Sequence, residues 1–355
     1  MDGKLSIFIM QILLNFGIYL IVTLSLNLEV GFLGLPQFGR VLTVLIGAIV
    51  AGGISGRIIA FYLGFPWGVE YTGYDNYRIV SEISDILANN PLLSLQYLII
   101  TLILAALLGG LIGYLTAYPA LRLKEAYLGI TLLAFGDIMN TIAWNFEPLA
   151  GGTTGVLVPD PFRFLGGYRF VGAIAIILAI AVLVYVYVEY LTRSPYGRVL
   201  RAVRDSEVAA VVYGKSITSL RRNTLIIGGA LAAIGGALWS IYTGSFSAET
   251  YTRLEWTFWP WAFMMLGGTG NNFGVLLGVL IFSIARTFII VYKDLISTYL
   301  MISPEWLEYI LIGLVIVLLA LFRPQGLIPE KPLSTLGRKE INRLVEEYLG
   351  RTERK

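Results

Sequence analysis

The chain consists of long stretches without charged residues, separated by short polar segments. About 20 mostly apolar residues are enough for an α-helix to cross the hydrocarbon core of a membrane. Stretches of roughly this kind predict membrane-spanning helices near 7–28, 93–116, 126–146, 170–190, 223–243 and 307–323. The apolar runs are continuous rather than alternating, so they indicate helices and not the strands of a membrane β-barrel.

Two further regions bring the number of expected spans to eight or nine. Residues 254–292 are apolar but contain a Gly- and Asn-rich turn at 267–272, which predicts two passes at 254–267 and 273–292. Residues 41–63 are also apolar, but they include four glycines and Arg57, so they fit either a full span or a re-entrant segment. The predicted fold class is an all-α polytopic membrane protein, a helical bundle of about eight or nine transmembrane spans.

The composition is typical of a membrane protein and excludes several kinds of catalytic and metal site. The chain is 57% hydrophobic and 14% charged, with a mean hydropathy of +0.75, whereas soluble domains are about 25% charged. None of the 355 residues is Cys or His, which excludes disulfides, thiolate nucleophiles, Ser-His-Asp triads and ordinary zinc sites. The chain contains no G-x-x-x-x-G-K-[ST] loop for ATP and nothing that resembles a nucleic-acid-binding module. We therefore expect no catalytic residue, metal ligand or cofactor in this chain.

The basic residues predict the orientation in the membrane. Of the 26 Lys and Arg residues, 17 lie in the three segments 117–125, 192–222 and 323–355. These segments fall on one side of the predicted spans, which the positive-inside rule assigns to the cytoplasm of a cell (inner or plasma) membrane. The loop 64–90 is mostly acidic and suits the outside. The N-terminus is outside if 41–63 is a full span and inside if it is re-entrant.

The segment 193–214 predicts a helical projection into the cytoplasm. Pro195 suits a first helical turn, and Gly214 is placed as a C-terminal stop, after which Ser216 or Thr218 can cap the next helix. The arginines at 198, 201 and 204 form a basic stripe, followed by an apolar face of valines at 208, 211 and 212. Anchoring to lipid phosphates explains the arginines equally well. The apolar face favours docking to a groove on another protein.

Asp137 lies in the middle of a predicted span, where a carboxylate costs about 2.5–3.5 kcal/mol and usually faces a bundle interior or water. Asn140, Thr141 and Asn145 follow at helical spacing and extend the polar stripe. A translocation pathway or gating contact and a structural hydrogen bond between helices are equally good readings. Arg286, in another span, is a candidate ion-pair partner for Asp137.

The C-terminal region predicts a separate unit. Residues 335–350 form an amphipathic pattern that suits either the membrane surface or a partner protein. We expect a transmembrane domain at 1–323, with the cytoplasmic loop 192–222 inside it, and a cytoplasmic amphipathic tail at 324–355.

Five blocks of sequence, taken in order, resemble the M-type (LivM-like) permease subunits of branched-chain amino acid ABC importers. They are Leu26-Asn27-Leu28 with Gly31, the run 121–138, Gly151-Gly-Thr-Thr-Gly155, the run 194–214, and Leu266-Gly-Gly-Thr-Gly270 together with Phe322-Arg-Pro-Gln-Gly-Leu327. The resemblance covers about residues 24–330 and implies a type II-like ABC importer architecture. The chain departs from the family pattern at 34–48.

The resemblance implies partners and roles. The expected partners are a second homologous (LivH-like) permease, two cytoplasmic ATPase subunits that bind ATP-Mg, an extracellular substrate-binding protein and membrane lipid, with no nucleic acid. The segment 194–214 is similar to a coupling helix, which implies ATPase-coupling roles for Gly197, Arg198, Arg201, Arg204, Glu207, Ala209, Ala210 and Gly214. The candidate pathway residues are Asn27, Asp137, Asn140 and Thr141.

Two alternatives remain open from the residues. The same machinery can serve urea, short amides or other small polar solutes instead of leucine, isoleucine and valine. An ion-coupled secondary transporter would need intramembrane ionisable groups, for which Asp137, Arg286 and Glu29 are the candidates. A membrane enzyme would need paired carboxylates or a Ser–Lys site, and neither pattern is visible.

Overall fold

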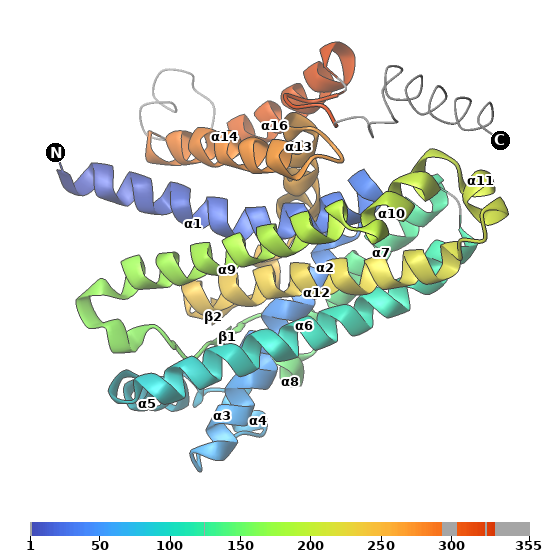
Figure 1. Ribbon diagram of the computed structural model, residues 1–355. Helices are drawn as coiled ribbons and strands as arrows, with labels where there is room; N and C mark the ends of the chain where they lie inside the picture. The colour runs from blue at the N-terminus through green and yellow to red at the C-terminus, as the bar shows by residue number, and fades with distance from the viewer. Residues whose placement is uncertain (1, 124, 293–303, 324, 331–355) are drawn as a thin grey trace, which may run out of the picture.

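The structure is a computed structural model that describes residues 2–123, 125–292, 304–323 and 325–330. The predicted amphipathic helix at 335–350 lies outside the described residues. Helices dominate the fold, and the long ones run side by side as a bundle (Figure 1).

Seven helices among the described residues are long and apolar enough to cross a membrane. They are α1 (Asp2–Asn27) with the π-helical η1 (Leu28–Phe32), α2 (Arg40–Ile49) with η2 (Val50–Ser55) and α3 (Gly56–Tyr62), α6 (Pro91–Arg122), α7 (Glu125–Asn145), α9 (Arg169–Arg193), α12 (Ile217–Thr243) and α14 (Asn272–Val291). The two shorter predicted passes correspond to η5 (Leu254–Phe258) with α13 (Trp259–Gly267), and to α16 (Pro304–Phe322). The prediction of an all-α bundle is confirmed.

The ambiguous region 41–63 is one continuous helical run, Arg40–Tyr62, and is the most buried of the candidate spans. It packs along α12, where small residues allow the two backbones to approach closely. The N-terminus of α1 lies at the end of the bundle opposite α10 (Pro195–Asp205) and α11 (Glu207–Val212) (Figure 1). This arrangement matches the alternative in which 41–63 passes through the bundle.

Helix α12 is the centre of the fold, because it packs against α6, α2 and α1. Its small residues between Gly228 and Ala237 are mostly buried in these contacts. The close spacing of small residues in this segment therefore serves helix packing, as expected for membrane helices.

Short elements cap the end of the bundle at which α6 and α9 begin. The helices are α4 (Val69–Thr72), α5 (Asn76–Asn89), α8 (Glu147–Ala150), η3 (Arg163–Tyr168) and η4 (Ala248–Thr250). Strands β1 (Val156–Leu157) and β2 (Ser245–Phe246) pair antiparallel, with Val156 opposite Phe246. The opposite end carries α10 and α11.

Candidate functional site

The segment between α9 and α12 forms a projecting elbow of two short helices rather than one. The sequence predicts a helix that runs on to residue 213, but the structure breaks it at Ser206, whose φ of −159° is extended. The Ser206 side chain accepts a hydrogen bond from the Ala209 backbone N–H (3.3 Å) and so caps a new helix, α11. Serine at a helix N-cap satisfies one of the free N–H groups of the first turn. The structure therefore differs from the prediction only locally, by a corner at Ser206 within the predicted projection.

The return of the chain into α12 follows the prediction. Gly214 has a φ of +73°, a left-handed conformation that glycine adopts without steric cost. Ser216 then caps α12, accepting a hydrogen bond from the Ser219 backbone N–H (3.4 Å). The Pro195 prediction is confirmed too, since this residue occupies the first turn of α10.

The tip of the elbow exposes a compact set of apolar side chains. The exposed fractions are 77% for Val208, 57% for Val211, 79% for Val212 and 80% for Tyr213. Ala210 lies beneath them and is buried. Single exposed apolar residues are common, whereas a cluster of them at the tip of a projecting helix is typical of interaction surfaces.

The basic stripe on α10 does not point outward as a unit. Arg198 is exposed, but Arg201 and Arg204 turn back toward the bundle. Arg201 Nη2 donates to the Thr192 carbonyl (3.1 Å), and Arg204 Nη1 donates to the Gly31 carbonyl (2.5 Å). These two arginines therefore tie α10 to the transmembrane helices.

The other predicted coupling residues hold the elbow in place. Gly197 packs so closely on the Thr192 carbonyl that a Cβ atom would lie 2.0 Å from its oxygen. Glu207 forms an ion pair with Arg221 of α12, and Ala209 is exposed beside the valines. The Tyr196 hydroxyl and the Thr224 hydroxyl are 2.7 Å apart, and burial raises the pKa of Tyr196. The base of the elbow is thus fixed, while its tip is free.

Helix α7 carries a second candidate site, and among the candidate spans it is the least buried. Asp137 Oδ2 lies 3.1 Å from Nη1 of Arg253, which precedes η5, and the two side chains are 48% and 53% exposed. The sequence left Arg286 as a possible partner for Asp137, and the structure pairs Asp137 with Arg253 instead. Arg286 pairs with Glu255 (2.5 Å) and also donates to the Tyr19 hydroxyl.

The remaining residues of the α7 stripe have different surroundings. Asn140 donates from Nδ2 to the carbonyls of Ala248 and Tyr251 (2.8 Å each), so it anchors α7 to the loop before η5. Thr141 is exposed beside Asp137 and donates to its backbone carbonyl (2.9 Å). The structure thus places Asp137 and Thr141 on one open face, with Asn140 at its edge.

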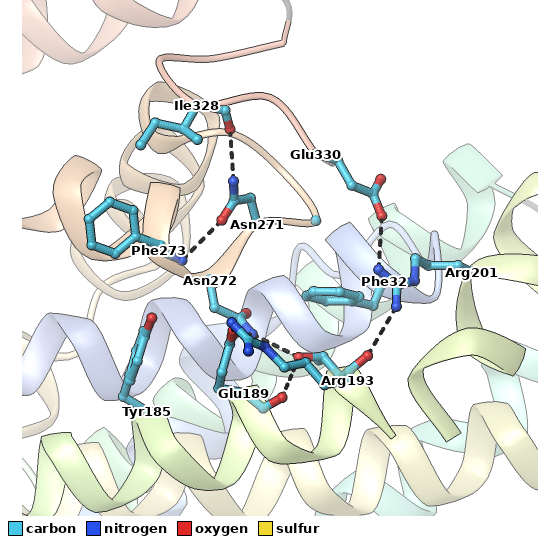
Figure 2. A pocket seen from close by; sticks show the side chains of 12 residues that line it. Phe32, Tyr185, Glu189, Arg193, Arg201, Asn271, Asn272, Phe273, Ile328 and Glu330 are labelled. Carbon is cyan, nitrogen blue, oxygen red and sulfur yellow. Dashed lines mark hydrogen bonds and ion pairs between the residues drawn. The ribbon is translucent and has the colours of Figure 1, made fainter. Parts of the chain in front are cut away.

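Asn27 lies in a buried polar network at the other side of the bundle. Its Nδ2 donates to Asn272 Oδ1 (3.0 Å), and its Oδ1 accepts from the Gly270 backbone N–H (2.9 Å). Asn272 donates in turn to Glu189 Oε2 (2.8 Å) beside a cavity of about 530 Å³ (Figure 2). Sequence reasoning named neither Asn272 nor Glu189, because only the fold brings α1, α9 and α14 together.

A fully buried ion pair also escaped prediction. Glu29 in η1 pairs with Arg40 at the start of α2, and their side chains are 1% and 0% exposed. Arg40 Nη1 also donates to the Gly228 carbonyl of α12 (3.1 Å). In the sequence, Glu29 and Arg40 stand out only as two opposite charges at the edges of apolar runs. Arg40 lies within the segment 34–48, which departs from the family pattern, and Glu29 lies shortly before it.

These features define a class of protein, a multi-pass membrane protein. Its long helices are apolar, one helix face keeps charges at mid-span, and an apolar elbow projects from one end. No group of three or more Asp and Glu side chains among the described residues could hold a metal ion.

The particular family follows from comparison with known proteins. Residues 8–320 match the family model for the permease component of the branched-chain amino acid transport system, and the chain belongs to this family. It is 43% identical over 330 residues to the "Probable branched-chain amino acid transport permease protein LivM" of Methanocaldococcus jannaschii, covering 92% of this chain and 95% of the relative.

Two bacterial permease proteins also match the chain. The high-affinity branched-chain amino acid transport system permease proteins LivM of Salmonella typhimurium and Escherichia coli are 28% and 27% identical over 253 residues. These alignments cover 64% of this chain and 56% of each relative. No solved structure matches the chain.

Proposed function

We propose that this chain is a permease subunit of an ATP-driven importer for leucine, isoleucine and valine. The single observation that carries the proposal is the exposed apolar tip of α11, held on a fixed base at one end of a membrane-spanning bundle. Such a tip fits a groove on a partner protein in the helix-in-groove mode. In this proposal the partners are two cytoplasmic ATPase subunits that bind ATP-Mg, so the chain itself is not an enzyme.

The orientation follows from the docking site. The elbow and the tail, residues 324–355, are cytoplasmic in this proposal, and the N-terminus, at the opposite end of the bundle, is outside (Figure 1). An extracellular binding protein delivers substrate to the outer end, at which α6 and α9 begin.

The α7 face supports a pathway shared with a second permease. Charged side chains exposed at mid-span are costly against lipid, so they face water or another protein. Asp137 and Arg253 are half-exposed in that position. We place the second, LivH-like permease opposite α7, and the solute pathway between the two subunits.

The ion pairs favour this proposal over an ion-coupled secondary transporter. The ionisable candidates for ion coupling are all engaged within the chain, Asp137 with Arg253, Glu29 with Arg40 and Arg286 with Glu255. The names of the relatives support branched-chain amino acids as the substrate class, in preference to urea or short amides.

The decisive experiment introduces negatively charged side chains at the elbow tip. Val211→Glu with Val212→Glu places two carboxylates on the apolar face, and we expect the ATPase subunits to be lost on purification in mild detergent and leucine uptake to cease. Glu207→Arg and Gly214→Pro should also abolish uptake, because one breaks the Arg221 ion pair and the other cannot adopt the φ of +73°. Membrane insertion should be normal in all three.

The matched control is Lys215→Glu, which adds negative charge next to the tip without changing the valines. It should retain the ATPases and the uptake. Copurification of ATPases with the double Val variant, or uptake that survives ATP depletion, would contradict the proposal. Competition of leucine uptake by urea in excess would contradict the substrate class.

A further inference from the structure

Arg204 of α10 lies where four separate parts of the chain meet. Its Nη1 donates to the Gly31 carbonyl at the π-helical end of α1 (2.5 Å), and its Nη2 lies 2.8 Å from Glu330 Oε2. The backbone of Gly270, in the turn between α13 and α14, approaches so closely that a Cβ there would lie 3.1 Å from Arg204 Nη1. A guanidinium with several donors in one plane suits this kind of junction.

Glu330 is held firmly on the α13 side of the junction. The segment that contains it is hydrogen-bonded to the end of α13, from Leu327 N–H to the Leu266 carbonyl (2.8 Å) and from Ile328 N–H to the Gly267 carbonyl (3.0 Å). Asn271 adds a bond to the Ile328 carbonyl, and Glu330 also faces Arg201 (3.7 Å) (Figure 2). A displacement of Glu330 is therefore passed to α13 through the backbone.

Two cavities flank the junction, so it is not embedded in a packed core. One of about 530 Å³ is bordered by Arg201 and Glu330, and another of about 480 Å³ is bordered by Arg204, Gly31 and Glu330. Close-packed cores resist small shifts, whereas a few polar contacts between cavities can be rearranged without repacking apolar side chains. The junction is thus a place where the contacts of Arg204 with Gly31 and Glu330 can rearrange while the elbow stays attached.

From α13 the contacts continue to the α7 face. Trp261 of α13 donates from Nε1 to the Gln37 carbonyl (2.9 Å), and its ring stacks on Phe38 at 4.7 Å. Helix α13 follows directly from η5, and Arg253, the residue before η5, forms the ion pair with Asp137. The path therefore runs through covalently continuous helix and through side-chain contacts.

We infer that Arg204 and Glu330 are positioning residues for transport, which carry movement of the elbow to α13 and so to the Asp137–Arg253 face. The inference rests on the proposed function and concerns side chains that face the bundle and not the exposed tip. The competing explanation is that these contacts only stabilise the fold. Spatial connection alone does not distinguish the two, so the test measures coupling between the residues.

The experiment uses the whole importer in proteoliposomes and measures leucine uptake and ATP hydrolysis together. Glu330→Arg and Arg204→Glu each place like charges at the junction, and we expect each to lower leucine uptake per ATP by about fivefold, which corresponds to ~1 kcal/mol. The double variant Arg204→Glu with Glu330→Arg restores the opposite charges. It should recover part of the lost uptake per ATP, because directly coupled residues make the double change smaller than the sum of the two single changes, while residue 330 still faces Arg201.

The matched control is Arg193→Gln. Arg193 borders the same 530 Å³ cavity and forms an ion pair with Glu189, but its contacts lie on α9 alone. We expect it to leave uptake per ATP unchanged. ATPase copurification should be normal for every junction variant, since the apolar tip is intact.

The possible outcomes distinguish a failure of the positioning role from a failure of the proposed function. Uptake per ATP that is unchanged in both single variants, or no recovery in the double variant, would overturn the positioning role. A loss of uptake that follows a fall in the amount of folded complex would overturn it as well, because stability would then explain the effect. If the original importer showed no coupling of ATP hydrolysis to uptake, the proposed function and this inference would fall together.

Discussion

Two ion pairs in the membrane-embedded part of this permease have opposite surroundings. Glu29–Arg40 is enclosed, with side chains 1% and 0% exposed, whereas Asp137–Arg253 is 48% and 53% exposed. The enclosed pair is linked to the carbonyl of Gly228 and joins the end of α1 to α2 and α12. The open pair joins α7 to the loop before η5 and has free surface around it.

The difference in burial distinguishes an ion pair that holds helices together from an ion pair that lies on an exposed surface. A buried pair stays ionised only because each partner compensates the other, so its role is to fix three helices in one arrangement. An exposed pair contributes little stability, about 0–1 kcal/mol. Its presence at mid-span is therefore typical of a surface that meets water or another protein. Three sets of variants test this comparison.

Breaking the enclosed pair should have the largest effect. Glu29→Leu leaves the Arg40 guanidinium buried without its carboxylate, and we expect a loss of about 3–5 kcal/mol in the free energy of unfolding. Replacing both residues, Glu29→Leu with Arg40→Met, removes both charges and should recover most of that loss. Denaturant titration in detergent, followed by tryptophan fluorescence, measures the change. A single variant as stable as the original would show that water reaches Arg40.

Filling the space beside the enclosed pair should have the next largest effect. A Cβ at Gly228 would lie 1.9 Å from Glu29 Oε1, so Gly228→Ala forces the pair or α12 to shift, at an expected cost of about 1–3 kcal/mol. Gly110→Ala is the control in α6, where the nearest atom would be 3.4 Å away. The control should leave unfolding unchanged. Equal effects of the two alanines would contradict a tightly enclosed pair.

Neutralising the open pair should have the smallest effect on stability and a selective effect on transport. Asp137→Asn keeps the shape of the side chain, whereas Arg253→Gln removes the charge and shortens the side chain. Each should change the free energy of unfolding by no more than ~1 kcal/mol, because the pair is exposed. We expect leucine uptake to fall about five- to tenfold, because these variants alter the charged surface that we propose faces the second permease. Uptake in proteoliposomes and unfolding in detergent are measured on the same preparations. Normal uptake would remove Asp137 from the pathway.

Much of the architecture could be predicted from hydrophobic pattern alone. The long apolar runs required membrane helices, and the prediction of two passes around 267–272 agrees with η5–α13 and α14. The elbow was predicted from Pro195 and Gly214, since these residues act on their own backbone. The corner at Ser206 was missed because serine caps compete with strong helix formers on both sides, and the balance depends on the surroundings.

The contacts between distant residues could not be predicted in this way. Asp137 was recognised as costly at mid-span, but the sequence offered only Arg286 as a possible partner, and the partner in the structure is Arg253. Arg201 and Arg204 were expected on the docking surface, and they face Thr192 and Gly31 instead. A helical period places a side chain on a face, but it does not say what that face meets.

The sequence by itself determined that this is a helical membrane protein, where its spans lie and which loop projects with an apolar tip. These properties depend on transfer from water to lipid and on local backbone preferences, and both are set by neighbouring residues. Only the tertiary structure decided which charges are enclosed, which are open and how the elbow is attached to the bundle. Those properties depend on which helices pack together, and ion pairs between residues 11, 116 or 126 positions apart arise only after that packing is formed.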